Sequence, residues 1–182
     1  MKLAFTKMHG CGNNYIYFNC FDQTVPDPES LSIKLSEPHF GIGGDGIILI
    51  SPSDKADAQM RIFNADGSEG KMCGNGIRCV GKYLYDNGMT DGRTTITIDT
   101  LSGVKTLELT VKDGKMQSAR VDMGAAILAP REIPVDMDGE NVISAPIVVD
   151  EKVYHMTCVS MGNPHCVIFQ KEDVDDLDLT RI

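Results

Sequence analysis

Residues 71–86, KMCGNGIRCVGKYLYD, place a cysteine at the start of a predicted helix. Cys73 is followed by Gly74, Asn75 and Gly76, although each glycine weakens a helix by about 1 kcal/mol relative to alanine. The unpaired amides of a helix N-terminus bind anions, and the same positive end favours a thiolate over a thiol. Glycines, which have no Cβ, let a carboxylate approach those amides. This stretch therefore predicts a sulfur base beside a cradle for a carboxylate.

Two kinds of chemistry fit that arrangement. One is nucleophilic attack on a carbonyl, which requires a histidine base in contact with the sulfur. The other is removal of a proton from the carbon next to a carboxylate, which requires a second acid on the opposite face. His165 could serve in either reaction, although a histidine before an apolar strand is more often structural. The competing interpretation of Cys73 is a buried residue without chemistry, but its polar surroundings, NADGSEGKMCGNG, argue against burial.

The segment GIGGDG, residues 41–46, spells the G-x-G-x-x-G pattern of dinucleotide-binding loops. That pattern must follow a strand and open a helix, whereas here a predicted helix precedes it and the strand IILIS follows. We therefore reject nucleotide binding and expect a tight loop that lines a site. The six cysteines form no Cys-x-x-Cys pair, and no histidine stands at zinc-finger distance, so no metal site is predicted.

The composition is that of a globular protein, since 42% of the 182 residues are hydrophobic and 24% are charged. The formal net charge is −9 and no segment gathers lysine and arginine, which argues against nucleic acid as a partner. No apolar run reaches the roughly 18 residues that a membrane span requires, and the N-terminus lacks the apolar core of a signal peptide. We therefore expect a cytoplasmic protein, in which the thiols stay reduced.

The apolar pattern predicts antiparallel strands with a few helices, an α+β fold. A helix over residues 75–86 ends at Asn87-Gly88 and is apolar on more than one face, so we expect a sheet to surround it. A second, short helix begins at Pro28 with Asp27 as its cap. Strands are predicted at residues 2–7, 14–20, 46–51, 58–64, 93–100, 103–111, 116–124, 147–150, 151–162 and 165–170, and residues 172–179, EDVDDLDL, are predicted as a solvated helix start.

Two short segments match at an offset of 150 residues: Gly12 and Asn13 precede the strand YIYF, and Gly162 and Asn163 precede CVIF. Gly-Asn turns before strands are common, so two unrelated turns are the simpler explanation of this match by itself. If the match reflects an internal repeat, the counterpart of Cys73 would fall near residue 223, past the 182 residues of this chain.

Four segments together resemble the signature blocks of the diaminopimelate epimerase family: KMHGCGNNYIYF, HFGIGGDGIILI, MRIFNADGSEGKMCGNGIRC and VSMGNPHCVIF. They stand in the order that the family shows. The resemblance implies two similar domains, each a curled, mainly antiparallel sheet wrapped round a central helix, with the active site between them. It also implies an isomerase that needs no cofactor, pyridoxal phosphate included, and that interconverts LL- and meso-2,6-diaminopimelate for lysine and peptidoglycan synthesis.

In that family two cysteines flank the substrate Cα, one removing a proton while the other returns one, and Cys73 matches the first of them. His165 matches a histidine beside the cysteine pair, which would tune or orient it. Some members carry glutamine at the position of Gly46, so that substrate contact would be absent here. The resemblance assigns substrate binding to Asn13, Asn64, Gly74, Asn75 and Asn163.

The chain differs from the family in length, because it lacks the Glu-Arg-Gly block and the Gly-Ala-Cys-Gly-Thr run with the second cysteine. We expect residues 1–123 to form the first domain and residues 124–182 to hold a crossing segment and the start of an incomplete second repeat. Such a chain would be inactive by itself, and its half-built sheet would favour self-association into a homodimer. Two alternatives remain open: a racemase or epimerase of proline or hydroxyproline, and a non-catalytic protein that binds at half a site.

Overall fold

The structure, a computed structural model, describes residues 2–178. It divides into two compact units, residues 1–123 and residues 124–182. Each unit has its own sheet and its own hydrophobic cluster, and they are described separately.

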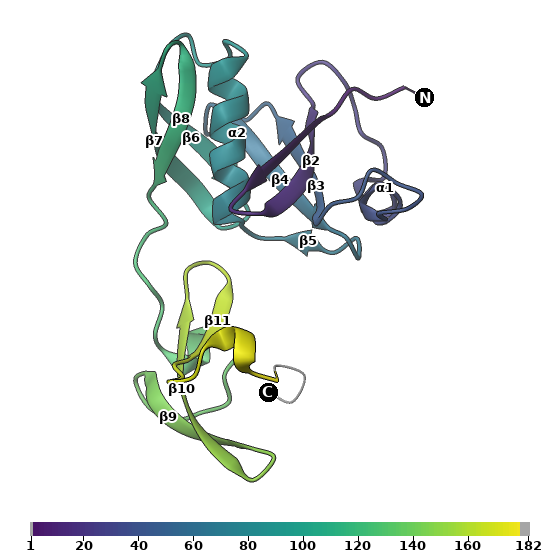
Figure 1. Cartoon of the computed structure of the whole chain (residues 1–182). Helices are drawn as coiled ribbons and strands as arrows, with labels where there is room; N and C mark the ends of the chain where they lie inside the picture. The colour runs from purple at the N-terminus through teal and green to yellow at the C-terminus, as the bar shows by residue number, and fades with distance from the viewer. Residues whose placement is uncertain (1, 179–182) are drawn as a thin grey trace. The chain divides into compact units, whose positions relative to one another are not determined.

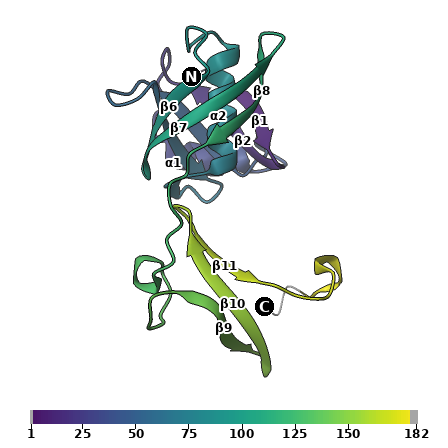
Figure 2. The ribbon, with the colours of Figure 1, turned by 90° about the vertical axis from the view of Figure 1, so that its left-hand side faces the viewer.

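Unit 1 is an eight-stranded sheet that curls around a helix, as Figure 1 and Figure 2 show from two sides. Two of its strand pairs, β2–β3 and β4–β6, are parallel, and the other pairs among the described residues are antiparallel. The predicted α+β class and the curled sheet round a central helix are therefore confirmed. In the order β1-β2-β3-β4-β6-β7-β8, with β5 on β4, the strands are β1 (Thr6–Gly10), β2 (Asn13–Asn19), β3 (Gly46–Ser51), β4 (Ala58–Asn64), β5 (Glu69–Gly70), β6 (Thr95–Thr100), β7 (Gly103–Lys112) and β8 (Lys115–Val121).

The central helix is α2 (Gly74–Asp86), which begins one residue before the predicted start. Its apolar residues face the concave side of the sheet, and Ile77, Val80 and Leu84 are at most 1% exposed. Gly81 lets the helix approach β7, because a Cβ there would stand 2.8 Å from the Leu107 side chain. The burial of several such side chains, each worth about 1.5–3 kcal/mol, holds α2 inside the sheet.

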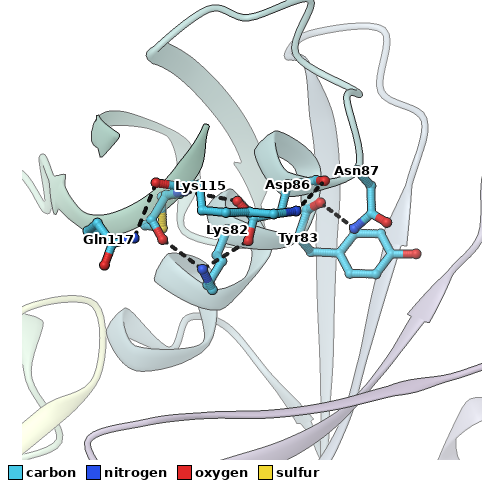
Figure 3. Close-up of polar contacts among 7 residues, drawn as sticks. Lys82, Tyr83, Asp86, Asn87, Lys115 and Gln117 are labelled. Carbon is cyan, nitrogen blue, oxygen red and sulfur yellow. Dashed lines mark hydrogen bonds and ion pairs between the residues drawn. The ribbon is translucent and has the colours of Figure 1, made fainter. Parts of the chain in front are cut away.

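The C-terminal end of α2 is tied to the edge strand β8 (Figure 3). The Asp86 carboxylate accepts from the backbone N–H of Met116 at 2.9 Å and forms an ion pair with Lys82 at 2.9 Å. The Asn87 side chain donates to the Tyr83 carbonyl at 2.8 Å, which satisfies one of the free carbonyls of the last turn.

The convex side of the sheet carries the second helix, α1 (Pro28–Ser36). Asp27 caps it as predicted, since its carboxylate accepts from the Ser30 N–H at 3.2 Å. The buried Ser32 hydroxyl lies 2.9 Å from the Phe63 carbonyl and fastens the helix to β4. Strands β2 and β3 are thus covered on both faces, which explains why their sequences are apolar without alternation.

The first predicted strand, residues 2–7, is wrong, because β1 starts at Thr6 and continues to Gly10. A two-residue turn of Cys11 and Gly12, both at positive φ, joins it to β2 and sets the pairing of Gly10 with Asn13. Residues before Thr6 form another contact instead, in which Ala4 exchanges two hydrogen bonds with the Gln23 side chain. The register follows the turn rather than the apolar residues at the N-terminus.

Unit 2 is a three-stranded antiparallel sheet in the order β11-β10-β9. One face packs against the segment before β9, which includes the short 3-10 helix η1 (Pro130–Glu132), and buries Ile133, Met156 and Cys158. A second 3-10 helix, η2 (Val174–Asp176), lies within the acidic stretch that was predicted as a helix start. Leu179 at the end of that stretch and residues 180–182 of the predicted second domain lie outside the described residues. The strands are β9 (Val142–Val149), β10 (Lys152–Ser160) and β11 (Pro164–Ile168).

Candidate active site

Cys73 is the N-cap residue of α2, with extended backbone angles of φ −139° and ψ 109°. Its Sγ accepts a hydrogen bond from the Gly76 N–H at 3.2 Å, in the way that a serine or aspartate cap would. Its thiol also lies 3.2 Å from Asn13 Oδ1, to which it can donate. The side chain is half-buried, which is less than the full burial that the competing interpretation assumed. The sulfur therefore stands, half-buried, at the positive end of the helix.

The loop GIGGDG holds Asn13 in place through its aspartate. The Asp45 carboxylate accepts from Asn13 Nδ2 at 2.8 Å and from the Asn14 N–H at 2.7 Å. In return the Asp45 N–H donates to the Asn14 carbonyl at 2.7 Å. Helix α1 precedes this loop and strand β3 follows it, which agrees with the rejection of a dinucleotide-binding loop. The loop lines the surroundings of Cys73, as the sequence predicted.

The two glycines after Cys73, Gly74 and Gly76, have different surroundings. A Cβ at Gly74 would meet nothing within 4 Å, so this residue faces open space. A Cβ at Gly76 would stand 2.8 Å from the Ile48 side chain and 3.4 Å from Cys73 Sγ. The Gly76 N–H is moreover occupied by the sulfur. The expectation that both glycines open the backbone to a ligand is therefore wrong for Gly76, which is a packing residue, and it stays a prediction for Gly74, which has the space that it requires.

Asn75 is anchored by its neighbours on both sides. Its side-chain Oδ1 accepts from the Arg78 guanidinium one turn along α2. Its backbone is packed against β1, because a Cβ on Gly10 would come within 2.9 Å of the Asn75 carbonyl oxygen. Cys73, Gly74 and Asn75 thus form one rigid turn that faces the β1–β2 hairpin.

Asn64 lies at the end of β4, in the loop that leads to Cys73. Its side chain donates to the Ser68 hydroxyl at 3.0 Å, and its backbone N–H donates to the Ser68 carbonyl at 2.9 Å. The neighbouring Ala65 N–H donates to the Asp45 carbonyl at 3.0 Å. Three connections of unit 1, namely residues 10–14, 41–46 and 64–73, are therefore linked around the start of α2.

Two predicted site residues, Asn163 and His165, belong to unit 2. Asn163 lies in the β10–β11 turn, where its carbonyl accepts from the Met161 N–H at 3.2 Å. His165 is exposed on β11 and pairs with Val159 of β10. The structure brings Cys73, Asn13, Gly74 and Asn75 together and places Asn64 at the end of β4, next to the loop that leads to Cys73. Asn163 and His165 lie two residues apart on unit 2.

Gly46 is buried at the start of β3 with φ 149°. A Cβ there would lie 2.1 Å from the Phe63 carbonyl, so the backbone requires glycine. A side chain that contacts a substrate from this position would need a different backbone path.

Two residues near Cys73 were not singled out from the sequence. Asp45 could have been noticed as the one charged residue of a glycine-rich loop that was expected to line a site. Nothing in the sequence singled out Tyr15, because a tyrosine in an apolar strand is normally interpreted as a core residue. It is 6% exposed, and burial, followed by the nearby charge of Cys73, raises the pKa of its hydroxyl to about 12.

Within residues 2–178 all six cysteines are free, and no cluster of three or more His, Cys, Asp or Glu side chains could hold a metal ion. None of the helices among these residues has the length and apolar character needed to cross a membrane.

Comparison with solved structures identifies the fold class. A hydroxyproline epimerase from Agrobacterium vitis, solved with bound trans-4-hydroxy-L-proline, superposes with a TM-score of 0.67 at 17% identity, over 90% of this chain and 50% of that one. At this identity the likeness defines the fold alone. Unit 1 and unit 2 are therefore built on the fold of the proline racemase and epimerase class.

Comparison of sequences identifies the family. The family model for diaminopimelate epimerase matches residues 5–129. The diaminopimelate epimerase of Acetivibrio thermocellus is 54% identical over 180 residues, which are 99% of this chain and 64% of that protein. That of Agathobacter rectalis is 54% identical over 182 residues, covering 96% of this chain and 62% of its own length. The chain belongs to the diaminopimelate epimerase family, and it spans less than two thirds of the length of these relatives.

Proposed function

We propose that this chain forms the Cys73 half of a diaminopimelate epimerase that uses two cysteines and no cofactor. In this proposal the Cys73 thiolate removes the α-proton of LL-2,6-diaminopimelate, and an acid on the opposite face returns a proton to give the meso form. The reverse cycle starts from the Cys73 thiol. A cytoplasmic location, where both thiols stay reduced, is part of the proposal.

The observation that carries the proposal is the open space at Gly74 beside the capping sulfur. The amides of Gly74 and Asn75 lie at the positive end of α2, and a Cβ on Gly74 would meet nothing within 4 Å. A carboxylate held there would place its α-carbon close to Cys73 Sγ, and it would stabilise the negative charge that develops when the proton leaves. Asn13, Asn64, Asn163 and His165 are the other residues to which we assign substrate contacts or orientation of the sulfur.

In this proposal the second cysteine lies in the part of the relatives that this chain does not span. One general acid or base contributes about 10²–10⁴-fold to a rate, so the chain by itself should epimerise diaminopimelate slowly at best. Exchange of the α-proton with solvent deuterium requires Cys73 but not the second cysteine, and it should persist at a reduced rate.

The experiment is a chimera of this chain with the remaining third of the Acetivibrio thermocellus relative. We expect it to convert LL-diaminopimelate to the meso form, and we expect Cys73→Ala to abolish the conversion while the fold persists. Mass spectrometry in deuterium oxide follows exchange by the chain without the graft, with Cys73→Ala as the background. An active Cys73→Ala chimera, or turnover of proline in place of diaminopimelate, would refute the proposal.

A further inference from the structure

Unit 2 places two cysteines directly opposite each other on neighbouring strands, which lie side by side in Figure 2. Cys158 of β10 pairs with Cys166 of β11 in an antiparallel ladder that runs from Met156 to Ser160 without a shift of register. Directly opposite residues of such a ladder project their side chains to the same face. That face is the packed one, because Cys158 is 3% exposed and lies in the unit 2 cluster with Met156. The two thiols therefore share one side of the hairpin.

The spacing of the two strands matches the span of a disulfide. Opposite residues of an antiparallel pair have Cα atoms about 4.5 or 5.5 Å apart, and disulfides join Cα atoms about 4.4–6.8 Å apart. The Cys166 sulfur also reaches over β10, since its Sγ lies 3.9 Å from the Sδ of Met156. Met156 stands two residues before Cys158 on the same strand and therefore on the same face. Joining the two cysteine sulfurs thus requires rotation of side chains rather than movement of the strands.

We propose that Cys158 and Cys166 are a reversible redox pair, which forms a cross-strand disulfide by exchange with a small disulfide such as oxidised glutathione. In a compartment that keeps thiols reduced, disulfides of this kind are transient and redox-sensing. The dithiol is then the resting form, and the disulfide forms when the glutathione pool becomes oxidised. Neither cysteine takes part in the proposed epimerase chemistry, so this inference stands independently of the proposed function.

The exchange has two steps, and exposure sets their order. Cys166 is exposed, whereas Cys158 is buried and its burial raises the pKa of its thiol. The Cys166 thiolate therefore attacks first, at one sulfur of oxidised glutathione, and forms a mixed disulfide while one glutathione thiolate leaves. The Cys158 sulfur then attacks the Cys166 sulfur of the mixed disulfide, and the second glutathione thiolate leaves. Two protein thiols are oxidised, one glutathione disulfide is reduced, and the two thiol protons pass to the two glutathione molecules.

The disulfide would fasten the hairpin that carries two predicted site residues. Two residue pairs of the ladder separate the cysteine pair from the turn that contains Asn163. His165 adjoins Cys166 on β11, and successive side chains of a strand point to opposite faces. Oxidation therefore fixes the register of the hairpin from its packed face and leaves the face of His165 unmodified.

The test is equilibration of the full chain with oxidised and reduced glutathione, followed by acid quenching and peptide mapping without reductant. Cyanogen bromide cleaves after Met161, between the two cysteines in the sequence, so only a disulfide keeps the peptides of Cys158 and Cys166 joined. At a fixed concentration of reduced glutathione, the folded chain should need about one tenth of the oxidised glutathione that it needs in concentrated urea, because the sheet holds the two sulfurs in position. Excess reduced glutathione should restore both thiols.

Cys11 is the internal control, because it is also exposed but lies in the β1–β2 turn, outside the paired residues of that hairpin. It should stop at the mixed disulfide with glutathione. The matched variant combines Cys158→Ala with Thr157→Cys, which moves the inner thiol by one residue and so to the other face of β10. In this variant Cys166 should also stop at the mixed disulfide.

Three results would overturn the proposal: a folded parent in which Cys166 stops at the mixed disulfide, an equal requirement for oxidised glutathione in the folded chain and in urea, or a shifted variant that forms the disulfide as readily as the parent. The first two decide the question even where the double variant does not fold. A disulfide that persists in excess reduced glutathione would contradict a reversible pair.

Discussion

The contrast between Gly74 and Gly76 gives the sharpest test of the carboxylate cradle. Both residues lie in the first turn of α2, and alanine at either position should gain helix propensity of about 0.5–1 kcal/mol. At Gly74 the new methyl group meets nothing within 4 Å. At Gly76 it would stand 2.8 Å from the Cδ1 of Ile48, so this fully buried side chain would have to shift. Overpacking of that kind costs about 1–3 kcal/mol.

Gly74→Ala should therefore be more stable than Gly76→Ala by about 1–3 kcal/mol, because the propensity gain cancels between the two. At roughly 4 °C per kcal/mol for a unit of this size, thermal unfolding should separate the variants by about 4–12 °C. The epimerase activity of the chimera should be lower with Gly74→Ala than with Gly76→Ala. A methyl group over the amide of Gly74 displaces a carboxylate from the cradle, and a displacement of about 1 Å lowers rates by about 100-fold.

The assay is paired: thermal unfolding of the chain followed by circular dichroism, and epimerisation by the chimera. A Gly74→Ala chimera that is stabilised and nearly inactive is the expected result. Full activity in that variant would mean that the substrate carboxylate does not bind at these amides. A Gly74→Ala chain less stable than Gly76→Ala would refute the assignment of the open and packed glycines.

Further predictions concern the loop, an acid-sensitive ion pair and unit 2. Gly46→Ala should destabilise unit 1 by about 3 kcal/mol or more in urea unfolding, since its Cβ would lie 2.1 Å from a carbonyl oxygen. The Arg93 guanidinium, together with donors on Thr97, lowers the pKa of Asp57 in the folded chain. The Asp57 carboxylate therefore stabilises the fold above about pH 4, and this contribution is lost as the pH falls through the lowered pKa. The difference in free energy of unfolding between the parent and Asp57→Asn should accordingly disappear in acid. Lysine at Val148 and Val153, which pair and are 67% and 55% exposed, should reduce self-association in sedimentation experiments.

The start of α2 could be predicted from the sequence because its signals are local. A capping side chain, two glycines and an apolar stretch ending at Asn87-Gly88 lie within one short segment, and each acts on its near neighbours. The helix and the capping position of Cys73 follow from those residues. The surrounding sheet was also predictable, because a helix that is apolar on several faces must be covered.

The contacts around the sulfur could not be predicted in the same way. The role of Gly76 depends on Ile48, which lies on β3. The orientation of the Asn13 side chain depends on Asp45, which lies in the loop before β3. In neither pair does the spacing of the two residues in the sequence indicate that they are in contact. The register of β1 was missed for a related reason, since the turn at Cys11 and Gly12 overrides the apolar residues before it.

A repeat at an offset of 150 residues, which the sequence only suggested, would account for the exposed face of unit 2. On β2, Ile16 and Phe18 pack toward α1, whereas Tyr15 and Tyr17 face α2. At an offset of 150 residues, Ile168 of β11 packs into the unit 2 cluster, while Val167 lies on the opposite face and is 36% exposed. The side that meets the helix in unit 1 is thus the side that carries Val148, Val153 and Val167 in unit 2. The relatives are longer than this chain, and we expect their additional third to cover this face, so that the chimera should bury Val148, Val153 and Val167.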